Sequence, residues 1–174
     1  MIAVTFALPA ESSEFLSRLR NKSDADRNGM TIIGGVIDDR QVEVLHTGVG
    51  KKVCRERLAK FLEDQQFEVL ISSGFAGALN DQLAIGDLLL AKNFSTMEVN
   101  ERRSSLSGLP IRTGDLLTVP ALIHSTEERN RLGRTSGADG VDMETEFIAR
   151  ACAMRVITDT PTEPFPAPAH VLGA

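Results

Sequence analysis

Short apolar runs of strand length alternate with helical apolar stripes along most of the chain. The apolar runs predict strands over 2–7, 30–37, 42–46, 68–73, 87–92, 116–119 and 154–158. Apolar residues that recur every three or four positions predict helices over 10–19, 53–63 and 141–153. The polar stretch 21–29 predicts a connection, and Asp38-Asp39-Arg40 predicts a hairpin turn. This order favours one α/β domain over residues 1–174, built as a sandwich around a mixed sheet.

Two glycine-containing stretches follow predicted strands. In Ser73-Gly74-Phe75-Ala76-Gly77-Ala78-Leu79, small residues allow a close approach of backbone to ligand, and the glycines permit a sharp turn off the strand end. In open α/β sheets, ligands bind outside the carboxyl ends of strands. Thr47-Gly48-Val49-Gly50-Lys51 leads from a strand into a helix, which suits an anion or hydroxyl site and equally suits a structural turn.

Composition narrows the class of protein. The net charge of -5 argues against a nucleic-acid-binding surface, and no segment reaches membrane-spanning length. Cys54 and Cys152 lack metal-ligand spacing and suit a reducing cytosol, and residues 1–10 lack the basic start of a signal peptide. We therefore expect a cytoplasmic protein with no metal and no cofactor. With no Trp or Tyr, stacking on a flat ligand must come from phenylalanine or an arginine plane.

Five landmarks in order resemble the nucleoside phosphorylase and nucleosidase superfamily, most closely its methylthioadenosine/S-adenosylhomocysteine nucleosidases. They are the first strand followed by Glu11, the stretch 47–51, the stretch 73–79 with Gly86-Asp87, Val141-Asp142-Met143-Glu144, and Arg155-Val156-Ile157-Thr158-Asp159. The resemblance implies a three-layer α/β sandwich with a mixed central sheet, shortened at its C-terminus. It also implies cleavage of the N-glycosidic bond of a purine nucleoside.

The resemblance assigns three carboxyl groups. Asp159 would protonate purine N7, for which burial must keep it protonated. Glu144 would accept hydrogen bonds from the ribose hydroxyls above Met143, and Glu11 would orient and deprotonate the attacking water. From the residues alone, Asp159 equally suits a strand-end cap, Glu11 and Glu144 suit first-turn helix acids, and Met143 suits a core position. The implied substrate-binding residues are Ala7, Val49, Gly50, Phe75, Ala76, Gly77, Met143, Glu144 and Thr158.

Three departures from the family pattern leave alternatives open. Phe75 replaces a small or hydroxylated residue, the segment 94–114 lacks an aromatic base-binding loop (for which Phe94 is a possible substitute), and 161–174 cannot form the family's closing helix. The acidic first loop favours water over phosphate as nucleophile. A phosphorylase, a non-catalytic nucleoside binder and an α/β protein with coincidental motifs remain as alternatives. We also expect a homodimer or larger homo-oligomer, because the missing helix should leave apolar surface to cover.

Overall fold

A ten-stranded mixed sheet runs through the part of the chain that this computed structural model describes, residues 1–63, 65–95, 111–148 and 151–164. The strands are β1 (Ile2–Phe6), β2 (Arg20–Arg27), β3 (Met30–Ile37), β4 (Arg40–His46), β5 (Val69–Ala78), β6 (Leu88–Ala91), β7 (Ile111–Gly114), β8 (Leu116–Thr118), β9 (Gly140–Asp142) and β10 (Cys152–Asp159). The helices are α1 (Pro9–Ser17), α2 (Lys51–Leu62), α4 (Thr126–Ser136) and the short 3-10 helix η2 (Thr145–Phe147).

The strand order is β2-β3-β4-β1-β5-β10-β6-β7, with β9 joining β5 and β8 joining β9. The central strands β4, β1, β5 and β10 are parallel. Strands β2 and β3 run antiparallel to their neighbours, and β6 is antiparallel to β10 but parallel to β7. The predicted mixed sheet is therefore confirmed. Parallel strands bring their carboxyl ends to the same edge, so the ends of β1, β5 and β10 are the natural place for a site.

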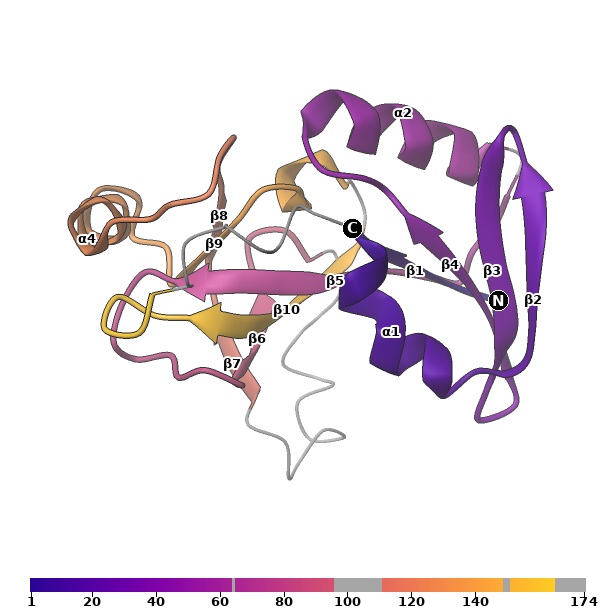
Figure 1. The fold of residues 1–174 in the computed structure, drawn as a ribbon, viewed down its shortest axis with the longest axis horizontal. Coiled ribbons are helices and arrows are strands. Elements are labelled where there is room, and N and C mark those ends of the chain that lie inside the picture. Colours follow the sequence, from indigo (N-terminus) through magenta and orange to yellow (C-terminus); the bar gives the residue numbers. More distant parts are fainter. Residues whose placement is uncertain (64, 96–110, 149–150, 165–174) are drawn as a thin grey trace.

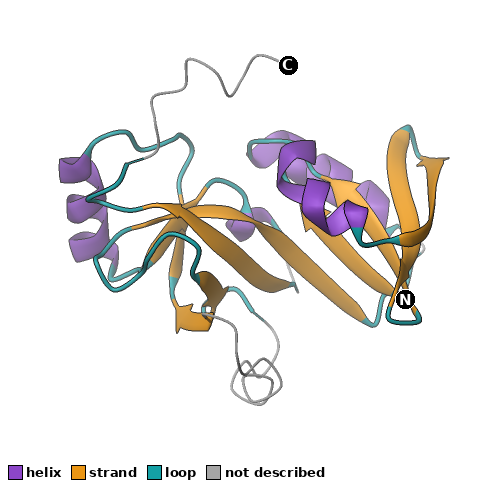
Figure 2. Cartoon of the chain, turned by 60° about the horizontal axis from the view of Figure 1, so that its bottom comes forward, coloured by secondary structure: helices purple, strands orange, loops and turns teal. Residues whose placement is uncertain are grey.

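Helices α1 and α2 cover opposite faces of β1 (Figures 1 and 2). Ala3 faces a cluster that contains Cys54, Leu58 and Phe61 of α2. Val4 and Phe6 face a second cluster with Phe15 and Leu16 of α1. Alternate strand residues point to opposite faces, so one short apolar strand supports both layers. Helix α4 lies at the far end of the molecule from the N-terminus, beside the ends of β5 and β10 (Figure 1).

Most predicted strands and the first two helices are confirmed, and the hairpin turn has Asp38 and Asp39 at φ 45° and 60°. The prediction of a connection over 21–29 is wrong, because most of it forms the edge strand β2. All but the last of the β2 residues are exposed. A polar, charged edge strand is hidden from an analysis of hydrophobic periodicity, and it protects the sheet from pairing with other chains.

The predicted helix over 141–153 is also wrong. The segment forms the end of β9, then η2, then the start of β10. The Asp142 carboxylate accepts hydrogen bonds from the backbone N–H and the hydroxyl of Thr145, and such local side-chain contacts compete with helical ones. Likewise the chain does not turn off the sheet at Gly74, whose φ of 158° is extended, and β5 continues to Ala78. Helix α4 and strand β7 were not predicted, and the polar segment 96–110 lies outside the described residues.

Candidate active site

A pocket opens where β1 ends and β5 continues. Strand β1 pairs with β5 only as far as Thr5 and Ser72, and β9 joins the same strand at Gly77. Between these points the Phe75 N–H of β5 donates to Glu11 of α1. The gap in the strand pairing thus creates the site.

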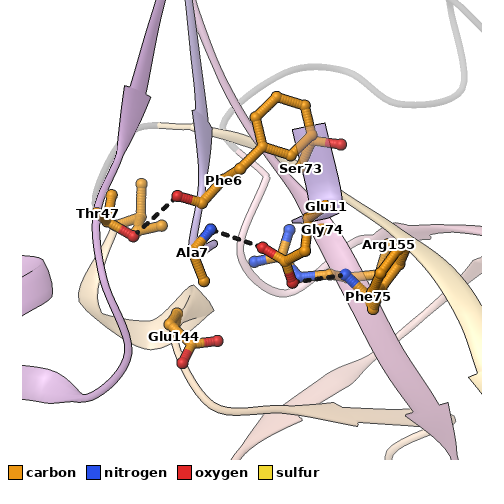
Figure 3. A pocket seen from close by; sticks show the side chains of 10 residues that line it. Phe6, Ala7, Glu11, Thr47, Ser73, Gly74, Phe75, Glu144 and Arg155 are labelled. Carbon is orange, nitrogen blue, oxygen red and sulfur yellow. Dashed lines mark hydrogen bonds between the residues drawn. The ribbon is translucent and has the colours of Figure 1, made fainter. Parts of the chain in front are cut away.

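The pocket has an empty volume of about 220 Å³ and draws its walls from β1, α1, β4, β5, β10 and the turn after β9 (Figure 3). Ten residues line it: Phe6, Ala7, Glu11, Thr47, Ser73, Gly74, Phe75, Glu144, Ile148 and Arg155. Four of them, Ala7, Glu11, Phe75 and Glu144, are among the predicted site residues.

Glu11 stands in the third position of α1 and points back toward the ends of β1 and β5 (Figure 3). Its Oε2 accepts the N–H groups of Ala7 and Leu8 at 2.8 and 2.9 Å, and its Oε1 accepts the Phe75 N–H at 3.4 Å. A side chain on Gly74 would approach Oε1 to 3.2 Å. Glu11 is therefore both a helix-start acid and a pocket residue. Oε2 is engaged by two donors, while Oε1 has one long bond and can accept another.

Glu144 follows β9 and lines the opposite wall. Burial raises the pKa of its carboxyl to about 7, with further increases from the charges of Asp142 and Glu11. The Arg155 charge and a hydrogen bond from the Gly50 backbone act in the opposite direction. At neutral pH this group is divided between its charged and uncharged forms, so it can accept or donate hydrogen bonds in the pocket.

The Arg155 side chain hydrogen-bonds residues of β5, β9 and η2 and so joins the elements that form the pocket wall. Its Nε donates to Asp142 Oδ2 at 2.9 Å, and Nη1 donates to the carbonyls of Ser72 and Met154 at 2.8 Å. Nη2 donates to Ser72 Oγ at 2.9 Å and to Thr145 Oγ1 at 2.5 Å. A guanidinium has five N–H groups, and these five bonds use all of them. The sequence motif contained Arg155, but nothing in its spacing indicated that the side chain would be saturated by protein groups.

Several other predicted residues lie close to the pocket without lining it. Gly50 precedes α2 with φ 90°, a conformation that favours glycine, and Val49 beside it is exposed. Met143 is half-buried next to Glu144, and Ala76 is buried in the cluster beneath β5. Met143 and Ala76 are chain neighbours of the lining residues Glu144 and Phe75, and the Gly50 backbone hydrogen-bonds Glu144. The sugar-side predictions Val49, Gly50 and Met143 and the base-side prediction Ala76 therefore border the pocket.

The other base-side predictions, Gly77, Thr158 and Asp159, lie farther along the sheet. Asp159 ends β10 and pairs in register with Gly77 of β5, outside the lining of the pocket. Its carboxylate forms a buried ion pair with Arg129 of α4. Thr158 donates its hydroxyl to Asp159 Oδ1 at 2.9 Å. The sequence analysis missed Arg129, because α4 was not predicted and no spacing links residue 129 to residue 159.

Among the described residues no group of His, Cys, Asp and Glu side chains could hold a metal ion. Within the same part of the chain, none of the helices has the length and apolar character needed to cross a bilayer.

Comparisons with known proteins agree with this fold. A 5'-methylthioadenosine/S-adenosylhomocysteine nucleosidase from Staphylococcus aureus is 22% identical over 87% of this chain and 79% of its own length. The solved structure of such a nucleosidase from S. pneumoniae, with a transition-state inhibitor, has a TM-score of 0.78 at 20% identity and covers 91% of this chain and 85% of its own. A futalosine hydrolase mutant from Helicobacter pylori has a TM-score of 0.76 at 18% identity over 95% of this chain and 90% of its own.

The family model that matches describes the phosphorylase superfamily and spans residues 1–105. The matched region contains seven of the ten residues that line the pocket: Phe6, Ala7, Glu11, Thr47, Ser73, Gly74 and Phe75. The chain belongs to the phosphorylase superfamily.

Proposed function

We propose that the protein cleaves the N-glycosidic bond of a purine nucleoside with water and releases the base. The observation that carries this proposal is the convergence of Glu11 and Glu144 on one pocket at the carboxyl end of β1. Relatives named as methylthioadenosine/S-adenosylhomocysteine nucleosidases and futalosine hydrolases support a hydrolytic reaction on a nucleoside.

On the sugar side, Glu144 binds the ribose hydroxyls, while Ala7, Val49, Gly50 and Met143 surround the sugar. Water is held at the free face of Glu11 Oε1 and loses its proton to that carboxylate as it attacks the anomeric carbon. The backbone N–H groups that fix Glu11 keep its carboxylate in one orientation. A fixed base positions the water for attack without an ordering step during the reaction.

On the base side, Phe75 and the backbone of Ala76 face the purine, with Gly77 and Thr158 near its far edge. Asp159 provides the proton that neutralises the departing base, as the family resemblance suggests. It stands at the carboxyl ends of parallel strands, the position at which α/β sheets bind their ligands.

Water is favoured over phosphate as the nucleophile because the Arg155 guanidinium and the Gly50 N–H, which could bind an anion, are already bonded to protein acceptors. Arg155 lines the pocket but gives all of its N–H groups to protein acceptors. The Gly50 backbone at the start of α2, a natural anion site, already hydrogen-bonds Glu144. The negative charge of Glu11 opposes a second anion in the same space.

One observation favours a second candidate, a nucleoside-binding protein without turnover. Asp159 forms a buried ion pair with Arg129, and a carboxylate paired with an arginine does not suit the role of a proton donor. Such a protein would bind nucleosides in the same pocket and leave the glycosidic bond intact.

We also propose that the chain forms a homodimer. Val49, Val53 and Phe75 are exposed apolar residues near the pocket, and an apolar surface at a site entrance suits an interface between copies. Sedimentation at micromolar concentrations should show the dimer, and a monomer throughout would contradict it. A cytoplasmic location and the lack of a nucleic-acid partner remain predictions from composition.

The proposed reaction is tested by measuring purine release from adenosine, methylthioadenosine, S-adenosylhomocysteine and inosine, with and without phosphate. We expect release of base and free sugar from at least one of these nucleosides, independent of phosphate. A sugar 1-phosphate as the main product would identify a phosphorylase. Tight nucleoside binding with no release would identify the binding protein.

A further inference from the structure

A buried ion pair joins helix α4 to the end of β10. The Arg129 guanidinium lies against Asp159 Oδ2, and the two residues are only 4% and 5% exposed. Charged side chains are almost never this buried unless they are paired. Each of the two side chains therefore compensates the charge of the other inside the protein.

The other contacts of the pair hold it in place without saturating it. Arg129 donates to the carbonyls of Ile123 and Ala78 at 3.0 and 3.4 Å, and Asp159 Oδ1 accepts from Thr158. Arg129 Nε and Asp159 Oδ2 nevertheless have no well-aligned hydrogen-bond partner among the described residues. The contact between the two side chains is thus a single-point ion pair and lacks the second bond of a bidentate fork, which adds energy and geometric specificity.

Gly77 makes room for this arrangement. A Cβ at this position would lie 2.9 Å from Asp159 Oδ2 and would clash with the Arg129 guanidinium. The ion pair therefore gives a structural reason for the small residue at this point in β5.

We propose that Arg129 controls the protonation of Asp159, holding it as a charged carboxylate in the resting protein, so that Asp159 becomes a proton donor only when this pair opens. The consequence for catalysis rests on the proposed function above, in which Asp159 protonates the departing base. Arg129 is thus a positioning residue, since it acts through Asp159 and does not touch the nucleoside.

Each proton in the reaction has a source and a destination. When the pair opens, the buried Asp159 takes up a proton, because an unpaired buried charge is strongly disfavoured. As the glycosidic bond breaks, its electron pair stays with the base, and the Asp159 proton moves to the base nitrogen. Water adds to the sugar and gives its proton to Glu11. Asp159, again charged, returns to Arg129, and Glu11 releases its proton to solvent.

The resting charge is measured directly by infrared spectroscopy of the carboxyl C=O stretch, comparing the wild type with Asp159→Asn. We expect no protonated carboxyl signal that depends on Asp159 in the wild type. In Arg129→Gln such a signal should appear, and it should vanish in Arg129→Gln/Asp159→Asn. Arg129→Lys should resemble the wild type because it keeps the charge. Arg131→Gln, on the same helix but with an exposed side chain, is the matched control.

Turnover tests the catalytic half of the proposal. Arg129→Gln should release purine about tenfold faster than the wild type, a small part of the 10²–10⁴ that a positioned acid contributes. It should leave cleavage of a nitrophenyl riboside unchanged, because nitrophenolate departs without a proton. Equal changes on both substrates, or slower purine release alone, would overturn the catalytic half and leave Arg129 as an anchor for α4.

The proposal would be overturned if the wild type showed the C=O stretch of a protonated carboxyl and Asp159→Asn did not. That comparison needs no change at Arg129, so it decides the matter even where Arg129→Gln fails to fold. A wild type that releases base from no nucleoside would overturn the proposed function. The infrared comparison would still decide whether Arg129 holds Asp159 charged.

Discussion

On the sugar side of the proposed site Glu11 is held by backbone N–H groups, whereas on the base side Asp159 is held by a guanidinium. Backbone donors fix a carboxylate without cancelling its charge. An arginine fixes the carboxylate and neutralises the site as well. The first arrangement suits a base that must accept a proton at once. The second suits a group that waits until its partner moves.

Glu144, in the same pocket as Glu11, is held in a third kind of environment. Burial and two neighbouring acids raise its pKa to about 7. Its carboxyl is therefore partly protonated at neutral pH, which reduces the charge repulsion between Glu144 and Glu11 on the sugar side. Three acidic residues assigned by one family resemblance therefore stand in three different electrostatic environments. Replacing the carboxyl by an amide should therefore have a different effect on activity or stability at each of the three positions.

The largest effect is expected from Glu11→Gln. An amide cannot accept the proton of water, so base release should fall by about 10³-fold on purine nucleosides and on a nitrophenyl riboside alike. Steady-state rates with and without phosphate measure this. The exposed Glu14→Gln on the same helix is the control. Release that stayed near the wild-type rate would remove Glu11 from the mechanism and with it the contrast between the two sides.

The next largest effect concerns the wall that carries Glu144. Arg155→Met leaves Asp142 as an unpaired buried charge, and the free energy of unfolding should fall by about 3 kcal/mol or more. Urea denaturation measures the change. Arg40→Met breaks an exposed pair with Glu68 and should lower the free energy of unfolding by less than about 1 kcal/mol. Equal losses in the two variants would show that Arg155 does not support the pocket wall.

Asp159→Asn sharpens the comparison on the base side. The amide keeps the shape of the side chain but has no proton to give to a departing base. Purine release should fall by about 10²-fold, with nucleoside binding largely retained. Cleavage of a nitrophenyl riboside should stay within a few-fold of wild type. Loss of both activities together would indicate a structural role for Asp159, and loss of neither would exclude it as the acid.

The smallest effect is a dependence of stability on pH. The folded-state pKa of Glu144 lies near 7, above its ordinary value of 4.5, so the folded protein binds more protons than the unfolded chain between these two values. The contribution of this group is therefore present below pH 4.5 and is lost as the pH rises toward 7.

Calorimetry of wild type and Glu144→Gln between pH 4.5 and 8 measures the contribution. The difference in Tm between the two proteins should change in favour of the variant as the pH rises. The burial that lowers the pKa of His46 acts equally in both proteins and cancels in that difference. Parallel curves for the two proteins would show that the Glu144 carboxyl is not perturbed by its pocket.

Local patterns of sequence determined the strands β1, β3, β4 and β5, the helices α1 and α2, and the position of the glycine turn before α2. These elements have a strong hydrophobic periodicity, so the local sequence is enough to predict a strand or a helix there. The landmarks at Glu11 and Phe75 depend on these elements, so their closeness in one pocket followed from parallel strand ends. Glu144 reaches the same pocket from the segment whose predicted helix is wrong.

Only the tertiary structure decided the elements and partners that depend on distant residues. The polar strand β2 forms because β3 offers it an edge, and the predicted helix over 141–153 fails because Asp142 meets Thr145 and Arg155. The pairing of Arg129 with Asp159 joins positions 30 residues apart, as the two numbers show, and no local preference fixes such a contact. The sequence alone specified which acids the protein has; the charge that each acid carries depends on neighbours that only folding brings near.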